Sequence, residues 1–137
     1  MHYHQDTALP VETPVYADGW GANSVKKGVI YCHAPTEFLS QILAIRINLD
    51  TSTSSNGPLK VIPNSHHRRL ETDDEFAGYL SKGQQVECTT EIGGVIAMSP
   101  LLLHASSKSL SEMPRRVLHI EYALSLDAGD GIRLAIS

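Results

Sequence analysis

The run Tyr3-His4-Gln5-Asp6-Thr7-Ala8-Leu9 lies near the start of the chain, and it contains the first two candidate metal ligands of the sequence. Its short alternating pattern predicts a strand, on which residues two apart face the same side. His4 and Asp6 can therefore reach one metal ion together, an imidazole nitrogen beside a carboxylate oxygen. A third ligand from elsewhere would complete two histidines and one carboxylate, a set that leaves positions open and suits non-haem Fe(II).

Composition limits the classes of protein that the chain can belong to. With 137 residues, 42% hydrophobic and 19% charged, residues 1–137 form a single globular domain. The net charge of −4 and the lack of a large basic cluster argue against nucleic-acid binding. Neither a signal peptide nor an apolar run of membrane-spanning length is present. Cys32 and Cys88 lack metal-type spacing, which indicates reduced thiols in a cytoplasmic protein.

Alternating apolar residues mark the remaining strands. The clearest run covers residues 42–49, where Leu43, Ile45 and Ile47 alternate with smaller or polar residues. Further strands are expected at residues 59–62, 85–91, 95–98, 101–104, 115–122 and 132–136, with a helical turn at 35–39 and a surface helix at 71–80. Many short strands and little helix predict an all-β fold, and a double-sheet jelly roll suits a metal site drawn from distant strands.

The segment from Pro10 to Ala34 contains two prolines and several Gly, Asp and Asn residues, which predicts a long loop. Long loops in compact domains are usually functional or disordered. Because the loop follows the metal strand, Trp20 is a candidate lid residue over the site, and ordinary packing of this side chain is the alternative.

Two later residues add to the metal-site hypothesis. His104 ends an apolar run, where a histidine is either a hydrogen-bonded core residue or a ligand. Arg115 comes eleven residues later and opens a strand after Pro114. An arginine fork is the usual partner for a carboxylate, although most arginines form surface ion pairs.

In order and spacing these residues resemble the phytanoyl-CoA dioxygenase family, along nearly the whole chain. The resemblance rests on His4-Gln5-Asp6, on the run from Asn56 to His66, and on His104-Ala105-Ser106 followed by Arg115. It implies a double-stranded β-helix, or jelly roll, of cupin-like type and an Fe(II)- and 2-oxoglutarate-dependent oxygenase. The family's metal ligands fall on His4, Asp6 and His104, and its cosubstrate-binding residues fall on Arg115 and Ser106, with Gln5 as a further cosubstrate contact.

Arg115 and Arg116 compete for the role of 2-oxoglutarate anchor, since they face opposite sides of one strand. Apolar-inward alternation alone selects Arg116, which shares its side with Leu118, Ile120 and Tyr122. The family spacing selects Arg115, and the expected covering of that sheet's outer face accounts for the apolar residues there. The resemblance also implies roughly a hundred residues before the metal strand, the size of a domain, so the domain is expected to be incomplete at its N-terminus.

The resemblance implies hydroxylation of a small organic substrate with molecular oxygen. Because Asp6 is a carboxylate, no metal position is freed for halide, and hydroxylation is favoured over halogenation. One alternative is a non-catalytic or truncated jelly roll that binds metal or a partner. Another is a cupin-like non-redox metalloenzyme such as an isomerase, against which a carboxylate-binding Arg115 argues.

An uncovered sheet face is also expected. With Arg115 facing inward, Leu118, Ile120 and Tyr122 face outward. The helix candidate at residues 71–80 is acidic and lies in mid-chain, so nothing in the sequence covers them. The chain is therefore expected to form a homo-oligomer or to bind a partner through this outer face.

Overall fold

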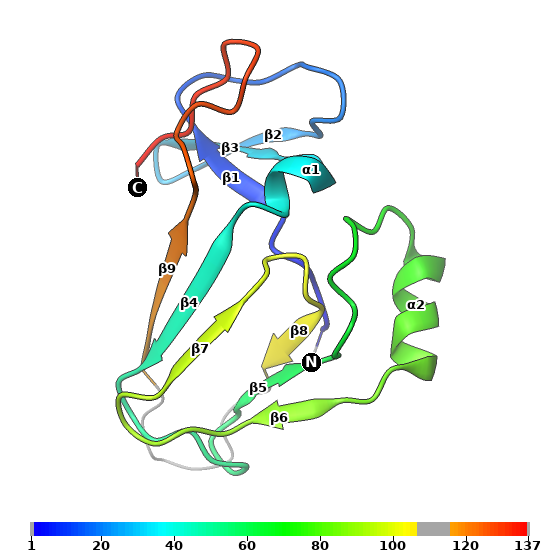
Figure 1. Cartoon of the computed structure of the whole chain (residues 1–137), viewed down its shortest axis with the longest axis vertical. Coiled ribbons are helices and arrows are strands. Elements are labelled where there is room, and N and C mark those ends of the chain that lie inside the picture. The colour runs from blue at the N-terminus through cyan, green and yellow to red at the C-terminus, as the bar shows by residue number, and fades with distance from the viewer. Residues whose placement is uncertain (1, 107–115, 137) are drawn as a thin grey trace.

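The computed structural model describes residues 2–106 and 116–136, whose strands form three small antiparallel sheets (Figure 1). The first has the order β1-β3-β2 and comprises Ala8–Val11, Val29–His33 and Asn23–Lys26. The second has the order β7-β4-β9 and comprises Val95–Met98, Leu43–Asn48 and Val117–Tyr122. The third has the order β6-β5-β8 and comprises Val86–Cys88, Leu59–Val61 and His104–Ser106.

The opening strand predicted over residues 3–9 forms only in part. His4 makes an isolated bridge with His104, and regular strand structure begins at Ala8 in β1. The strand predicted over residues 101–104 likewise starts only at His104, because Ser99 and Pro100 introduce a turn that Leu102 closes with a hydrogen bond to the Ser99 carbonyl. The predicted tail strand is reduced to two bridges, which pair Leu134 with Val11 and Arg133 with Asp127.

The long loop predicted from Pro10 to Ala34 is wrong for the second half of that range. Strands β2 and β3 form a hairpin closed by the pair Lys26 and Val29. Its two-residue turn, Lys27-Gly28, has positive φ at both positions, 52° and 79°. Such a turn matches the twist of a hairpin, but Lys at its first position hides the signal that Asn-Gly or Asp-Gly would give.

Apolar side chains gather in three buried clusters. One joins the first sheet to helix α1 (Thr36–Leu39), and Trp20 packs against it with its ring 6.0 Å from that of Phe38. Trp20 is therefore a packing residue of this cluster. Between the β7-β4-β9 and β6-β5-β8 sheets the fully buried apolar side chains are few. They are Ala44, Leu59 and Met98, with Val61, Cys88, Ile96 and Leu102 partly buried against them.

Helix α2 (Asp73–Lys82) confirms the surface helix expected at residues 71–80. Thr72 and Glu75 form a capping box, in which each side chain binds the other residue's backbone N–H. A hydrogen bond from Arg68 lowers the pKa of Glu75 to about 2, so this cap stays ionised. Phe76 and Tyr79 pack on a third cluster. Neither α1 nor α2 is long and apolar enough to cross a bilayer, and the described residues contain no other helix.

The outer face of the β7-β4-β9 sheet is apolar, as the strand alternation predicts. Cross-strand neighbours on this face are Leu43 with Tyr122, Ile45 with Ile120, and Ile47 with Leu118. Leu118 is 47% exposed and Tyr122 is 55% exposed. Helix α2 does not cover them, because it packs on Ile62, Leu70 and Leu103 instead.

We predict that the isolated chain self-associates through this face. Burying an apolar side chain of this size gains about 1.5–3 kcal/mol, and several lie side by side here. Light scattering of the purified chain should give a mass above that of a monomer, and the double variant Leu118→Lys, Tyr122→Lys should lower it. Val25→Lys is the control, since Val25 is 70% exposed on β2, outside this face. A monodisperse monomer would contradict the prediction.

Candidate metal centre

Three side chains from two distant parts of the chain converge at one point. His4, Asp6 and His104 each offer one ligand atom, and these atoms all lie within 4.8 Å of one another. Asp6 lies between the two imidazoles: its Oδ1 is 3.4 Å from His4 Nε2 and its Oδ2 is 3.1 Å from His104 Nε2. The convergence expected from the spacing of the sequence is therefore present in the structure.

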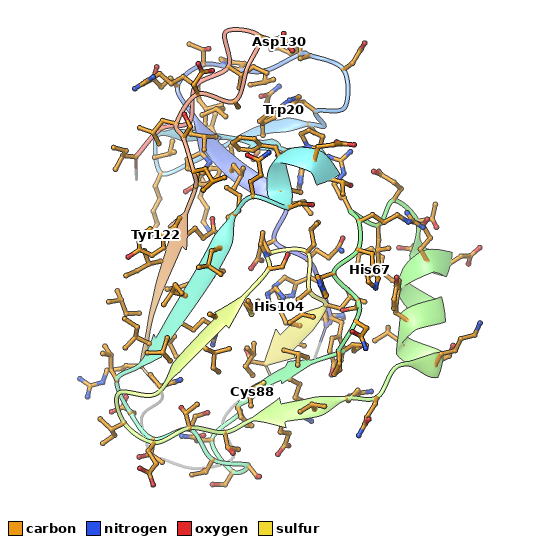
Figure 2. All side chains as sticks on the ribbon, in the orientation of Figure 1. Trp20, His67, Cys88, His104, Tyr122 and Asp130 are labelled. Atoms are coloured by element: carbon orange, nitrogen blue, oxygen red, sulfur yellow. The ribbon has the colours of Figure 1, made fainter. Side chains whose placement is uncertain are left out.

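Backbone pairing holds the metal strand beside β8. His4 and His104 exchange backbone hydrogen bonds of 3.0 and 3.1 Å, and the Asp6 N–H donates to the Pro100 carbonyl at 2.9 Å. His104, which Figure 2 places near the middle of the molecule, has a side chain only 5% exposed. Its Nδ1 lies 2.7 Å from the Leu102 carbonyl, a contact that requires the proton on Nδ1. Loss of the Nε2 proton that faces Asp6 then gives the tautomer that binds a metal through Nε2.

The electrostatics of the site favour an ionised Asp6. Burial alone would raise the pKa of this carboxyl, but hydrogen bonds from His104 and His4 hold it well below its usual range. The hydrogen bond with Asp6 in turn raises the pKa of the His4 imidazole, against the opposing effect of burial. The carboxylate thus supplies the negative charge that a divalent cation would neutralise.

A cavity of roughly 600 Å³ opens at this point and is lined by residues of all three sheets. Ligand pockets are commonly about 300–1,000 Å³. All three converging residues line it, as does Ser106. Gln5 lines it as well, and the remaining polar lining residues, which had no role in the sequence-based hypothesis, are Thr7, Lys26, Tyr31, His33, Arg46, His119 and Glu121.

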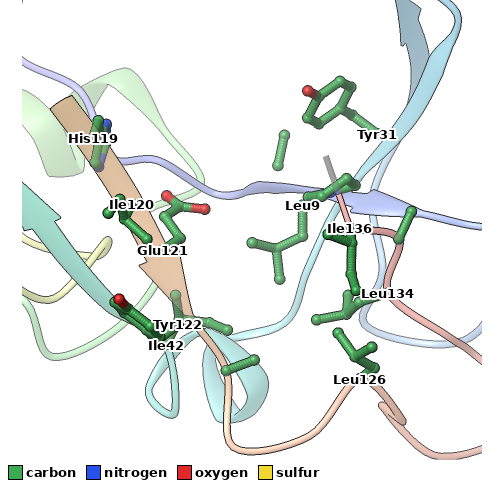
Figure 3. A pocket seen from close by; sticks show the side chains of 14 residues that line it. Leu9, Tyr31, Ile42, His119, Ile120, Glu121, Tyr122, Leu126, Leu134 and Ile136 are labelled. Atoms are coloured by element: carbon green, nitrogen blue, oxygen red, sulfur yellow. The ribbon is translucent and has the colours of Figure 1, made fainter.

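His119 and Glu121 are the most informative of these additions. They project from β9 (Figure 3). Their ligand atoms lie within 4.8 Å of each other and of a carboxylate oxygen of Asp6. Burial and the Asp6 carboxylate raise the pKa of Glu121, while burial lowers that of His119. The sequence shows that His119 and Glu121 lie on the same face of this strand, because they are two residues apart. Only the fold shows that this face points toward Asp6.

A second, mainly apolar pocket of roughly 430 Å³ adjoins the cavity (Figure 3). The two share four lining residues: Ala8, Tyr31, His119 and Glu121. Leu9, Ile42, Leu126 and Leu134 line the second pocket and give it its apolar character. A ligand beside Asp6 could therefore extend an apolar part into this space.

The structure places the residues expected to bind 2-oxoglutarate in different environments. Arg115 lies outside the described residues, and Ser106 lines the cavity. The amide of Gln5 makes hydrogen bonds to the backbone of Arg68, Leu70 and Leu101, and Gln5 also lines the cavity. Its expected role as a cosubstrate contact stays a prediction.

Arg116, the competing arginine, makes a surface ion pair. Its Nε and Nη2 each lie 3.0 Å from a carboxylate oxygen of Asp50, and its backbone N–H also donates to Asp50. The Arg116 side chain is 71% exposed. This arginine is therefore committed to a partner on the surface.

Comparisons with known proteins agree with this geometry. The sequence model of the phytanoyl-CoA dioxygenase family matches residues 21–117, a range that contains His104 and begins after Asp6. L-proline trans-4-hydroxylase from Streptomyces griseoviridis is 33% identical over 57% of this chain and 39% of its own length. The chain thus spans well under half the length of this relative.

Solved structures give the same fold. EctD from S. alaskensis, solved with 2-oxoglutarate and 5-hydroxyectoine, is 28% identical with a TM-score of 0.55, over 60% of this chain and 30% of its own. The same protein has also been solved with bound Fe. EvdMO1, at 23% identity and a TM-score of 0.59, covers 90% of this chain and 23% of its own, a likeness of fold alone. The fold is a mostly β jelly roll of the cupin-like type.

Proposed function

The chain belongs to the phytanoyl-CoA dioxygenase family, whose enzymes depend on Fe(II) and 2-oxoglutarate, and we propose that it is a dioxygenase that hydroxylates a small organic substrate. The observation that carries the proposal is the convergence of His4, Asp6 and His104 at the wall of one cavity. We further propose that residues 1–137 form a single jelly-roll domain.

The donor set fits iron. Two imidazole nitrogens and one carboxylate on one side of a metal leave open positions for a cosubstrate and oxygen, which is the pattern of non-haem Fe(II) oxygenases. When bound, the iron would supply oxygen activation, and the protein supplies binding and orientation. His104 is held in the required tautomer by Leu102, and Asp6 provides the one anionic donor of the three.

We assign the cosubstrate to the same cavity. Arg115 would pair with the distal carboxylate of 2-oxoglutarate, and Ser106 would donate a hydrogen bond to it. Two observations support this choice over Arg116: Ser106 lines the cavity, and Arg116 is engaged with Asp50. The substrate would lie in the remaining space, with its apolar part in the adjoining pocket between β1 and β9.

Oxygen consumption that depends on 2-oxoglutarate tests the proposal. The Fe(II)-loaded chain should consume oxygen and form succinate only when 2-oxoglutarate is present, because keto-acid oxidation accompanies turnover in this class. Uptake that is independent of 2-oxoglutarate would refute it.

A metal-binding protein without turnover is the second candidate. It is favoured by the His4 side chain, a required ligand that is 55% exposed. Tight metal binding with no oxygen uptake, with or without 2-oxoglutarate, would establish this alternative.

A further inference from the structure

We propose that Gln5 is the positioning residue of the metal centre and fixes the orientation of the His4 and Asp6 side chains. This inference rests on the proposed function. Gln5 lies between these two residues in the sequence. Its amide makes three hydrogen bonds to backbone groups of two other segments.

These contacts use both ends of the amide. Nε2 donates to the Leu101 carbonyl at 2.7 Å and to the Arg68 carbonyl at 2.9 Å. Oε1 accepts from the Leu70 N–H at 2.8 Å. The Gln5 amide therefore pairs with residues 68–70 as the backbone of a neighbouring strand would. It also binds Leu101, in the turn that leads into His104.

Because side chains alternate along an extended chain, fixing the Gln5 side chain also fixes the orientation of its neighbours His4 and Asp6. On an extended chain the side chains on either side of Gln5 point away from its own side chain. The Gln5 amide reaches the backbone of residues 68–70 and of Leu101, while the ligand atoms of His4 and Asp6 converge with that of His104. Fixing the Gln5 side chain on one face restricts rotation of the strand about its own axis. The ligand atoms of His4 and Asp6 are thereby held toward His104. Gln5 also makes a hydrogen bond to Leu101, in the turn that precedes His104.

Only an amide can make this set of contacts. Glutamate has the same size, but its carboxylate has no N–H and would face the carbonyls of Arg68 and Leu101. Methionine fills similar volume and supplies neither a strong donor nor a strong acceptor. The backbone groups that lose a partner would then be satisfied only by movement of the strand.

Cobalt(II) binding, followed by the visible absorption of the bound ion, tests the proposal without requiring turnover. Gln5→Met and Gln5→Glu should both weaken cobalt affinity about 10–100-fold, the range for lost outer-shell partners. Both should also change the spectrum at saturating cobalt. The Gln5→Glu result is diagnostic, because an added negative charge beside the ligands would by itself strengthen cation binding.

Asn23→Leu is the matched control. The amide of Asn23 also clamps backbone groups, donating to the Val15 carbonyl at 2.8 Å and accepting from its N–H at 2.9 Å, and it does not line the metal cavity. This variant should lose thermal stability yet keep the wild-type cobalt affinity and spectrum. Circular dichroism establishes that each variant is folded, and Gln5→Glu preserves side-chain size if Gln5→Met does not fold.

The outcomes separate this inference from the proposed function. Absence of cobalt binding by the wild-type chain would refute both. Binding by the wild-type chain with the same affinity and spectrum in the Gln5 variants would overturn this inference alone. Equal loss of affinity in Asn23→Leu would also overturn it, because the effect would then follow general stability.

Discussion

Replacement of Asp6 by alanine is expected to abolish oxygen uptake and to lower metal affinity by more than about 100-fold, the upper end for a lost outer-shell partner. Asp6 is the one anionic donor among the three converging side chains. Its two oxygens also lie 3.4 and 3.1 Å from the imidazoles of His4 and His104. Removing this carboxylate therefore removes both a ligand and the group that holds the other two together.

Cobalt titration and an oxygen electrode measure the two effects of this variant. Asp50→Ala is the matched control, since Asp50 is also a carboxylate with a charged partner but lies at the surface pair with Arg116. It should leave cobalt affinity unchanged. Retention of affinity within a few-fold in Asp6→Ala would place the metal away from these residues and remove the basis of the proposed function.

Replacement of Arg115 by alanine is expected to raise the 2-oxoglutarate requirement strongly while leaving Fe(II) affinity nearly unchanged. Losing a partly buried charge-assisted pair costs about 2–5 kcal/mol, which corresponds to roughly 30-fold or more in the concentration needed. Metal affinity should be unaffected, because on the proposed assignment the arginine pairs with the cosubstrate and is not a ligand. Oxygen uptake as a function of 2-oxoglutarate concentration measures the effect.

Arg116→Ala is the control for this experiment. Arg116 already makes a bidentate pair with Asp50 at the surface, and such exposed pairs contribute little to stability. The variant should therefore show wild-type 2-oxoglutarate dependence. If Arg116→Ala weakens cosubstrate use and Arg115→Ala does not, the assignment along this strand is wrong by one residue.

Local patterns in the sequence determined several features that the structure bears out. The alternation in residues 42–49 and 115–122 fixed which face of β4 and β9 is apolar, because side chains on a strand alternate strictly. The start of α2 follows from Thr72 and Glu75, a capping box whose contacts span only three residues. The shared face of His4 and Asp6 also follows from their separation by one residue.

Only the tertiary structure decided the features that depend on pairing between distant segments. The β2–β3 hairpin escaped prediction because its Lys27-Gly28 turn lacks the usual residues and because β3 is stabilised by pairing with the distant β1. The sequence showed that His119 and Glu121 share a face, but their closeness to Asp6 depends on how the sheets pack. The role of Gln5 depends on partners some 65 and 96 residues away. Such contacts are set by the packing of whole elements, which local periodicity does not encode.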